Sequence, residues 1–365
     1  MVDWAIVSVI YLITLILTIK GSAITKHSDR GEEYRLYNQM IAGKRWVNTD
    51  LVSSCLFSCY FPSLVYRLIG RGKDVIFRIA APPFYSLMPV FTYLIAREYF
   101  DIWYSVLATA FLLSNFFFLY FNDTGRVGIA QGFLAGLVYG LLINNLYIAC
   151  VFAVLVVVSH YGTAYLALFI LGVTAILLPP SNVYIVCVVL GISLLIWHWG
   201  ICSHTGITCL RVAIRAIKCD TTSDINSRIT RTSIITGCSQ ARKSLRLPSK
   251  VELVMSLLVV GLICMGFITG FNGLPPLTKA LSIAMMVSIA LTLLSPFAAF
   301  HYGPTRVYHT NLILLSSLFV VGIKWLADLT GLTGYGIAAC VIIIYGLCTS
   351  GGLHFILGVN KRGER

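Results

Sequence analysis

Two acidic side chains follow the first apolar run of the chain and could act in proton transfer. The segment 28–34 reads Ser-Asp-Arg-Gly-Glu-Glu-Tyr and contains Asp29 and Glu33. A carboxylate just outside a membrane span can take a proton from an acceptor hydroxyl if it lies within hydrogen-bond reach. Asp29 and Glu33 are therefore candidate catalytic residues. The alternative is a solvated loop whose acids balance three basic neighbours, Lys26, Arg30 and Arg35.

A second group of polar residues lies between two apolar runs with almost no loop to spare. Residues 122–126 read Asn-Asp-Thr-Gly-Arg. The Asp123 carboxylate is suited to hold a hard divalent cation such as Mg²⁺ or Mn²⁺. Arg126 is suited to bind a phosphate, because its planar guanidinium donates several hydrogen bonds. The alternative is that Asp123 and Arg126 pair only with each other.

Two further polar turns interrupt the apolar sequence. His160 lies in the turn 159–163 and could bind a phosphate or a sugar hydroxyl. The alternative is a histidine that is hydrogen-bonded by interfacial water. The polar island 301–309 contains Arg306 and two histidines, which suggests anion binding, although it could also be a simple connector. Ionisable residues at the edge of a membrane are costly to bury, so each is a candidate for function.

The segment 201–250 is strongly basic, with nine lysines and arginines against two acids. Its part 208–219 is amphipathic and predicts an interfacial helix that places Arg211 and Arg215 at the level of lipid headgroups. Such a cluster beside a membrane indicates contact with phosphate, of lipids or of a lipid-linked substrate. A merely solvated loop is the alternative. Nucleic acid is a poor candidate partner, because no binding motif or interleaved aromatic residue accompanies the charge.

The composition shows what must position these residues. Of 365 residues, 58% are hydrophobic and 11% are charged, whereas an ordinary soluble domain has about 25% charged residues. Because a helix needs about 20 apolar residues to cross a bilayer, we predict an all-α, polytopic transmembrane bundle of about 11 spans, in the range of about 10–12. The spans are expected near 5–19, 77–96, 104–121, 127–143, 146–159, 162–178, 182–200, 251–270, 279–299, 310–326 and 335–357.

The chain is predicted to have three consecutive parts. Residues 1–200 form a transmembrane module with a long first extracytoplasmic loop, 20–76; residues 201–250 form the basic interfacial segment; residues 251–365 form a second transmembrane module. Glycines four residues apart are expected to allow close helix packing. These are Gly132, Gly136 and Gly140 in one span and Gly266 and Gly270 in another.

Sparse landmarks along most of the chain resemble the N-terminal module of GT-C glycosyltransferases and, more narrowly, an archaeal family of polytopic membrane proteins of uncharacterised function. They are Ser28-Asp29, Glu33-Tyr34, Gly43-x-x-Trp46, Pro62, Phe77-Arg78, Pro82, Pro89, Tyr93, Arg97, Ser159-His160-Tyr161, Trp197-x-Trp199 and Arg306-x-Tyr308-His309. The resemblance implies a multi-pass enzyme of the plasma membrane that moves a sugar from a polyprenyl-phosphate or pyrophosphate donor to an acceptor on the extracytoplasmic face.

The same resemblance implies roles for individual residues. Asp29 matches the catalytic base or metal-associated carboxylate of the family, and Asp123 matches its second acidic position. The donor phosphate would be held by basic residues, namely Arg126, His160, Arg306, Arg211 and Arg215. The family's Asp-x-Asp motif and its large soluble C-terminal domain have no clear counterpart here. A protein partner would then supply acceptor recognition, or the chain is a minimal member.

Alternatives remain open for topology and for function. If 51–69 is re-entrant, the residues 29, 123, 160 and 306 share one side of the membrane, which we prefer. If 51–69 crosses, the basic segments lie inside, as the positive-inside rule favours, but Asp29 is separated from Asp123. Other functional classes are a non-catalytic subunit of a membrane complex, a transporter, and a ligase or polymerase of lipid-linked glycans that uses arginine and histidine.

Overall fold

The computed structural model describes residues 3–21, 29–44, 51–115, 125–179, 181–217, 248–294 and 304–350. Within these ranges all regular structure is helical, as the composition predicts. The chain divides into two compact units, which are described separately. Unit 1 comprises Met1–Ile95, Leu119–Asp220 and Pro275–Leu291, and unit 2 comprises Ala96–Phe118, Thr221–Leu274 and Thr292–Arg365. The three-part organisation along the sequence stays a prediction.

Unit 1 contains most of the helices, and α6 (Leu87–Arg97) and α16 (Pro276–Leu294) each continue from it into unit 2. The others in unit 1 are α1 (Trp4–Gly21), α2 (Asp29–Ile41), α3 (Leu56–Ile69), α4 (Lys73–Ala80), α5 (Pro82–Tyr85), α9 (Gly125–Leu142), α10 (Leu146–Ser159), α11 (Tyr161–Leu177), α12 (Asn182–Leu194), the π-helical η1 (Leu195–Ile201) and α13 (Ser203–Ile217). Unit 2 contains α7 (Ile102–Ser114), α15 (Pro248–Gly270), the 3₁₀ turn η3 (Phe271–Gly273), α17 (Pro304–Thr330) and α18 (Gly334–Ser350).

The helices are those of a polytopic membrane protein. Four stretches of the described chain are long and apolar enough to cross a bilayer, and eight shorter apolar helices accompany them. The four are Lys73–Arg97, Gly125–Leu142, Asn182–Ile201 and Arg306–Thr330. Large apolar side chains such as Ile176, Val188 and Ile268 are more than half exposed, which suits a lipid solvent and not water.

Most predicted spans coincide with a helix, but the span expected at 77–96 is interrupted. It consists of α4, α5 and α6, which follow one another from Lys73 to Arg97. Pro82 and Pro83 occupy the first turn of α5. Proline lacks a backbone N–H and clashes with the preceding turn, which explains why the helix is interrupted before this pair.

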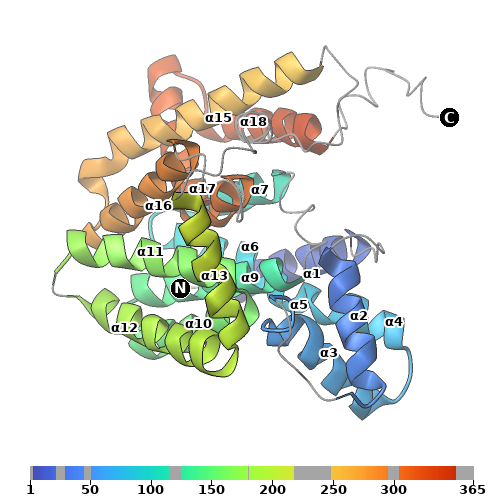
Figure 1. Ribbon diagram of the computed structural model, residues 1–365. Helices are drawn as coiled ribbons and strands as arrows, with labels where there is room; N and C mark the ends of the chain where they lie inside the picture. Colours follow the sequence, from blue (N-terminus) through green and yellow to red (C-terminus); the bar gives the residue numbers. More distant parts are fainter. Residues whose placement is uncertain are drawn as a thin grey trace. The chain divides into compact units, whose positions relative to one another are not determined.

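The predicted first loop is itself largely helical. Figure 1 shows α2, α3 and α4 packed side by side in unit 1. The α3 helix has 14 residues and contains Pro62, so its length is about 21 Å at 1.5 Å per residue. This is short of a hydrocarbon core about 30 Å thick. The loop after α1 therefore forms a small helical layer that carries Glu33.

Glycines bring helices into backbone contact, as predicted. In unit 1, a Cβ atom on Gly132 would overlap the carbonyl oxygen of Phe84, and one on Gly140 would lie 2.7 Å from the amide nitrogen of Ala149. In unit 2, a Cβ atom on Gly266 of α15 would overlap the carbonyl oxygen of Leu318 in α17. Small residues allow this close approach between apolar helices.

Gly266→Ala should destabilise the protein, because the added methyl group meets backbone that cannot move aside. Overpacking of this kind costs about 1–3 kcal/mol. Gly261→Ala is the matched control: it lies on the same helix, and nothing is within 4 Å of its Cβ position. Thermal unfolding of the detergent-purified variants should show a lower midpoint for Gly266→Ala only. Equal midpoints would contradict the α15–α17 contact.

Candidate functional site

The carboxylate of Glu33 is fully buried and has basic partners on two helices. Its Oε2 accepts a hydrogen bond from Nη1 of Arg30 at 3.1 Å, within α2. Its Oε1 accepts a hydrogen bond of 3.2 Å from the backbone N–H of Arg126, at the start of α9. The Nε atom of Arg126 lies 4.0 Å from the same oxygen. Glu33 therefore joins the segment after the first span to the segment that follows α7.

Arg30 is buried as deeply as Glu33, so these two residues are not part of a solvated loop. Its Nη2 donates to the carbonyl oxygen of Phe77 at 2.7 Å, and its guanidinium carbon lies 4.2 Å from the centroid of the Phe77 ring. The sequence interpretation assigned Arg30 only a balancing charge and missed this role. The spacing of three residues between Arg30 and Glu33, which allows contact within a helix, was the available signal.

Aromatic side chains hold α2 against α4. The hydroxyl of Tyr34 donates to the carboxylate of Asp74, and the hydroxyl of Tyr37 donates to the carbonyl oxygen of Lys73 at 3.0 Å. The rings of Tyr34 and Tyr37 also pack on Phe77, with centroids 5.0 and 5.2 Å away. These contacts fix the position of the helix that carries Asp29 and Glu33.

The close contact of Arg30 and Glu33 with the start of α9 requires a glycine at position 125. A Cβ atom at this position would overlap Nη1 of Arg30 and would lie 2.9 Å from Oε2 of Glu33. Gly125 is also the first residue of α9, so the Glu33 carboxylate sits at the N-terminus of an 18-residue helix. A negative charge is favourable there, because the first backbone N–H groups have no helical partner.

His160 lies in a neighbouring turn of unit 1. It caps α11, with the backbone N–H of Thr163 donating to its Nδ1 at 3.2 Å, and it is almost fully buried. The next residue, Tyr161, offers its backbone N–H to the thiol of Cys55, and the thiol of Cys59 donates to the carbonyl oxygen of Glu33 at 3.6 Å. Cys55 and Cys59 are four residues apart, about 6 Å along a helix. The turn of His160 and the Glu33 cluster are therefore both in contact with the N-terminal end of α3.

Burial and charge act on Glu33 in opposite directions. Burial raises the pKa of its carboxyl group above the ordinary value, and the guanidinium groups of Arg30 and Arg126 and the backbone N–H of Arg126 lower it. Both carboxylate oxygens are engaged by these donors. A general base has to reach the proton of its substrate, which the fully buried carboxylate of Glu33 can do only if the residues around it move.

The structure describes the other predicted residues less completely. Asp29 is the first residue of α2, with its side chain outside the described part, and Asp123 lies outside the described residues. A divalent cation at these two carboxylates stays a prediction. Where side chains are described, no group of three or more histidine, cysteine, aspartate or glutamate residues gathers in a way that could hold a metal.

The described contacts of the Glu33 cluster include none of the remaining basic residues. Arg211 is exposed on α13, the helix expected at 208–219, and Arg215 lies on the same helix with its side chain outside the described part. Arg306 is partly buried near the start of α17, in unit 2. Their role in phosphate binding stays a prediction.

The contact between Glu33 and Arg126 bears on the ambiguous segment 51–69. Two apolar passages, Lys73–Arg97 and α7, lie between these residues in addition to α3. Two crossings return the chain to its starting side, whereas three would leave Glu33 and Arg126 on opposite sides. The described α7 has 13 residues and α3 has 14, so helix length does not decide which of the two crosses, and a re-entrant 51–69 stays a prediction.

No family model matches this chain, and no curated protein gives a significant match. Among solved structures, the crystal structures of ArnT from Cupriavidus metallidurans bound to undecaprenyl phosphate and in the apo state are similar, with TM-scores of 0.43 and 0.41. Each is 12% identical in sequence, and the matches cover 95% of this chain and 77% and 78% of those chains. At this level of similarity, we take the function of the chain from its own residues.

Glu33→Gln should destabilise the protein strongly, because it leaves the buried charges of Arg30 and Arg126 without their shared anion. Removing one partner of a buried ion pair costs about 3–5 kcal/mol. Glu32→Gln is the matched control, since Glu32 and its partner Arg35 are both about half exposed and such a pair contributes less than about 1 kcal/mol. The measurement is thermal unfolding in detergent. If both variants unfold at the wild-type temperature, the buried cluster is wrong.

Proposed function

We propose that this chain is an integral membrane glycosyltransferase of the GT-C type. It transfers a sugar from a polyprenyl-phosphate or polyprenyl-pyrophosphate donor to an acceptor on the extracytoplasmic face of the plasma membrane. The observation that carries the proposal is the buried contact of Glu33 with Arg126. It brings together the two chain segments in which the sequence predicts catalytic carboxylates.

The contact limits how far apart those carboxylates can be. Asp29 lies four residues before Glu33 on α2, and residues four apart share a helix face. Asp123 lies three residues before Arg126, in the segment that leads into α9. A single active site that uses both carboxylates is therefore compatible with the packing of unit 1. The contact of Glu33 with Arg126 is the observation that supports a shared site for residues 29 and 123.

The two arginines of the cluster suit an anionic donor. Arg30 and Arg126 carry two positive charges, against one negative charge on Glu33 when it is ionised and the charges of Asp29 and Asp123, whose side chains lie outside the described part. Arginine binds phosphate oxygens through parallel hydrogen bonds. We assign Arg126 to the donor phosphate, with His160 nearby as a second ligand, and we assign Glu33 and Arg30 to positioning Arg126.

The proposed step needs one base and one stabilised leaving group. The acceptor hydroxyl oxygen forms a bond to the anomeric carbon of the sugar and gives its proton to the Asp29 carboxylate. The bond between the anomeric carbon and the phosphate oxygen breaks, and its electron pair leaves with the polyprenyl phosphate. Arg126 and His160 would stabilise the negative charge of that leaving group, as preorganised donors do in other transferases.

Asp29→Asn should reduce transfer by at least about 100-fold, because proton transfer by a positioned carboxylate contributes about 10²–10⁴-fold. The assay follows a labelled sugar from a polyprenyl-phosphate donor in proteoliposomes. Donor binding, measured on the same preparation, should be retained. Glu32→Gln controls for loss of a neighbouring charge. Wild-type transfer by Asp29→Asn would exclude Asp29 as the base.

Removal of divalent cations tests the predicted metal role of Asp29 and Asp123. If both carboxylates hold Mg²⁺ or Mn²⁺, chelation with EDTA should abolish transfer, and either ion should restore it. Asp123→Asn should then raise the concentration of metal that gives half-maximal rate. Transfer that continues undiminished in EDTA would remove the metal from the proposal and leave Asp29 as a base alone.

A further inference from the structure

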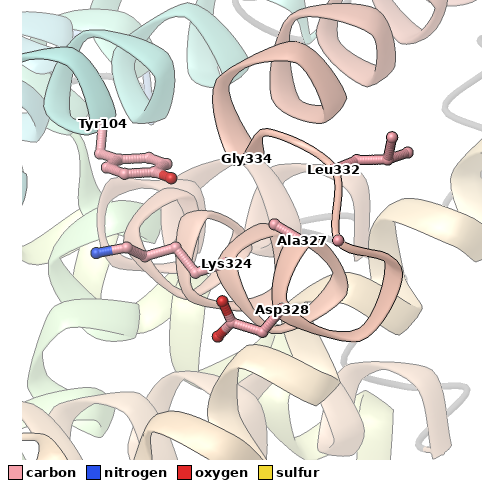
Figure 2. A pocket seen from close by; sticks show the side chains of 7 residues that line it. Tyr104, Lys324, Ala327, Asp328, Leu332 and Gly334 are labelled. Atoms are coloured by element: carbon pink, nitrogen blue, oxygen red, sulfur yellow. The ribbon is translucent and has the colours of Figure 1, made fainter.

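A polar hollow opens in unit 2 where three apolar helices end. The α7 helix begins at Ile102, α17 ends at Thr330 and α18 begins at Gly334. The hollow has a volume of about 380 Å³ and is lined by Tyr104, Lys324, Asp328 and the turn 331–334 (Figure 2). This volume lies in the range of about 300–1,000 Å³ that is usual for small-molecule sites.

The wall of the hollow is held by local contacts. The rings of Tyr104 and Tyr335 stack with their centroids 4.4 Å apart, and the hydroxyl of Tyr335 donates to Oδ2 of Asp101 at 3.3 Å. Asp101 also caps α7. Gly331 ends α17 with φ of +69°, a conformation that glycine adopts without strain. The hollow is therefore built by these side chains and this turn together.

Two opposite charges face this hollow without neutralising each other. The ammonium group of Lys324 lies 4.6 Å from the centroid of the Tyr104 ring and 5.5 Å from that of Phe100. Asp328 is one helical turn further along α17. In the described part of the chain, neither residue forms an ion pair. Figure 2 shows Lys324 extending beneath Tyr104, with the carboxylate of Asp328 separate from the ammonium group.

The surroundings place the hollow at the level of lipid headgroups. Trp103 is 68% exposed and Tyr335 is 44% exposed, and both lie in the first turns of apolar helices. Leu329 and Leu332 are also exposed beside them. Tryptophan and tyrosine collect where a membrane meets water, and the long side chain of Lys324 can reach that level from within the helix.

We propose that this hollow binds a phosphodiester that carries a primary amine, the chemistry of phosphoethanolamine. The phosphate pairs with Lys324, and the ammonium group donates hydrogen bonds to Asp328. Lys324 and Asp328 together have no net charge, so a zwitterionic ligand would give each side chain a partner of opposite charge. A quaternary ammonium group has no N–H to donate, and the Tyr104 ring that could attract it is already in contact with Tyr335 and Lys324.

The same chemistry occurs in a lipid headgroup and in a soluble phosphodiester, so the test has two arms. In the first, native mass spectrometry compares binding of phosphatidylethanolamine and phosphatidylcholine with identical acyl chains to the purified, delipidated full chain. In the second, calorimetry measures binding of soluble glycerophosphoethanolamine. The variants are Lys324→Gln and Asp328→Asn, and Lys44→Gln is the control, because Lys44 is an exposed lysine of unit 1.

The wild type and Lys44→Gln should bind phosphatidylethanolamine on the order of tenfold more tightly than phosphatidylcholine, the effect of one charge-assisted hydrogen bond. Asp328→Asn should lose that preference, because Asp328 accepts the hydrogen bonds of the ammonium group, and Lys324→Gln should weaken the binding of both lipids, because both carry the phosphate. If only glycerophosphoethanolamine binds, and both variants weaken its binding, the hollow is confirmed as a binding site and its ligand is a soluble phosphodiester. The proposal is overturned if neither probe binds, or if both variants bind the probes as the wild type does.

Discussion

The burial of one carboxylate sets the arrangement of unit 1. An ionised carboxylate cannot be removed from water unless basic groups and hydrogen-bond donors replace its hydration. Glu33 has both: the guanidinium of Arg30 and the backbone N–H and guanidinium of Arg126. Gly125 must be a glycine for them to approach, and Phe77, which packs against the two tyrosines of α2, contacts Arg30. These contacts fix α2 against α4 and the start of α9.

That arrangement explains why the loop after α1 does not behave as a solvated loop. It also has a consequence for topology, because a segment fixed to the start of α9 must be on the same side of the membrane. The 14-residue α3 helix packs against α2, and whether it also crosses the bilayer stays a prediction. Its thiols at Cys55 and Cys59 connect the backbone of Tyr161 to that of Glu33. Glu33, Arg126 and His160 are thus buried neighbours in unit 1.

Apolar runs were sufficient to predict the membrane helices. The expected spans at 127–143 and 146–159 are α9 and α10 within two residues at either end, because length and hydropathy decide where a helix can cross lipid. The interruption at Pro82 was not predicted, although the two prolines were visible. The pairing of Glu33 with Arg126 could not be predicted at all. The residues are 93 positions apart, and only tertiary packing brings them together.

A buried ion pair is weak evidence of stability, because apolar residues of similar volume often stabilise a fold as well or better. Three buried charges in a membrane protein therefore require another explanation. Either they fix a unique docking of α2 on α9, or the arginines also serve a ligand. Two arginines meet Glu33 in the described part of the chain, and the neighbouring segments carry Asp29 and Asp123, whose side chains are not described. Under the proposed function, the phosphate of a lipid-linked sugar binds Arg126 there, while Glu33 and Arg30 hold that guanidinium in position.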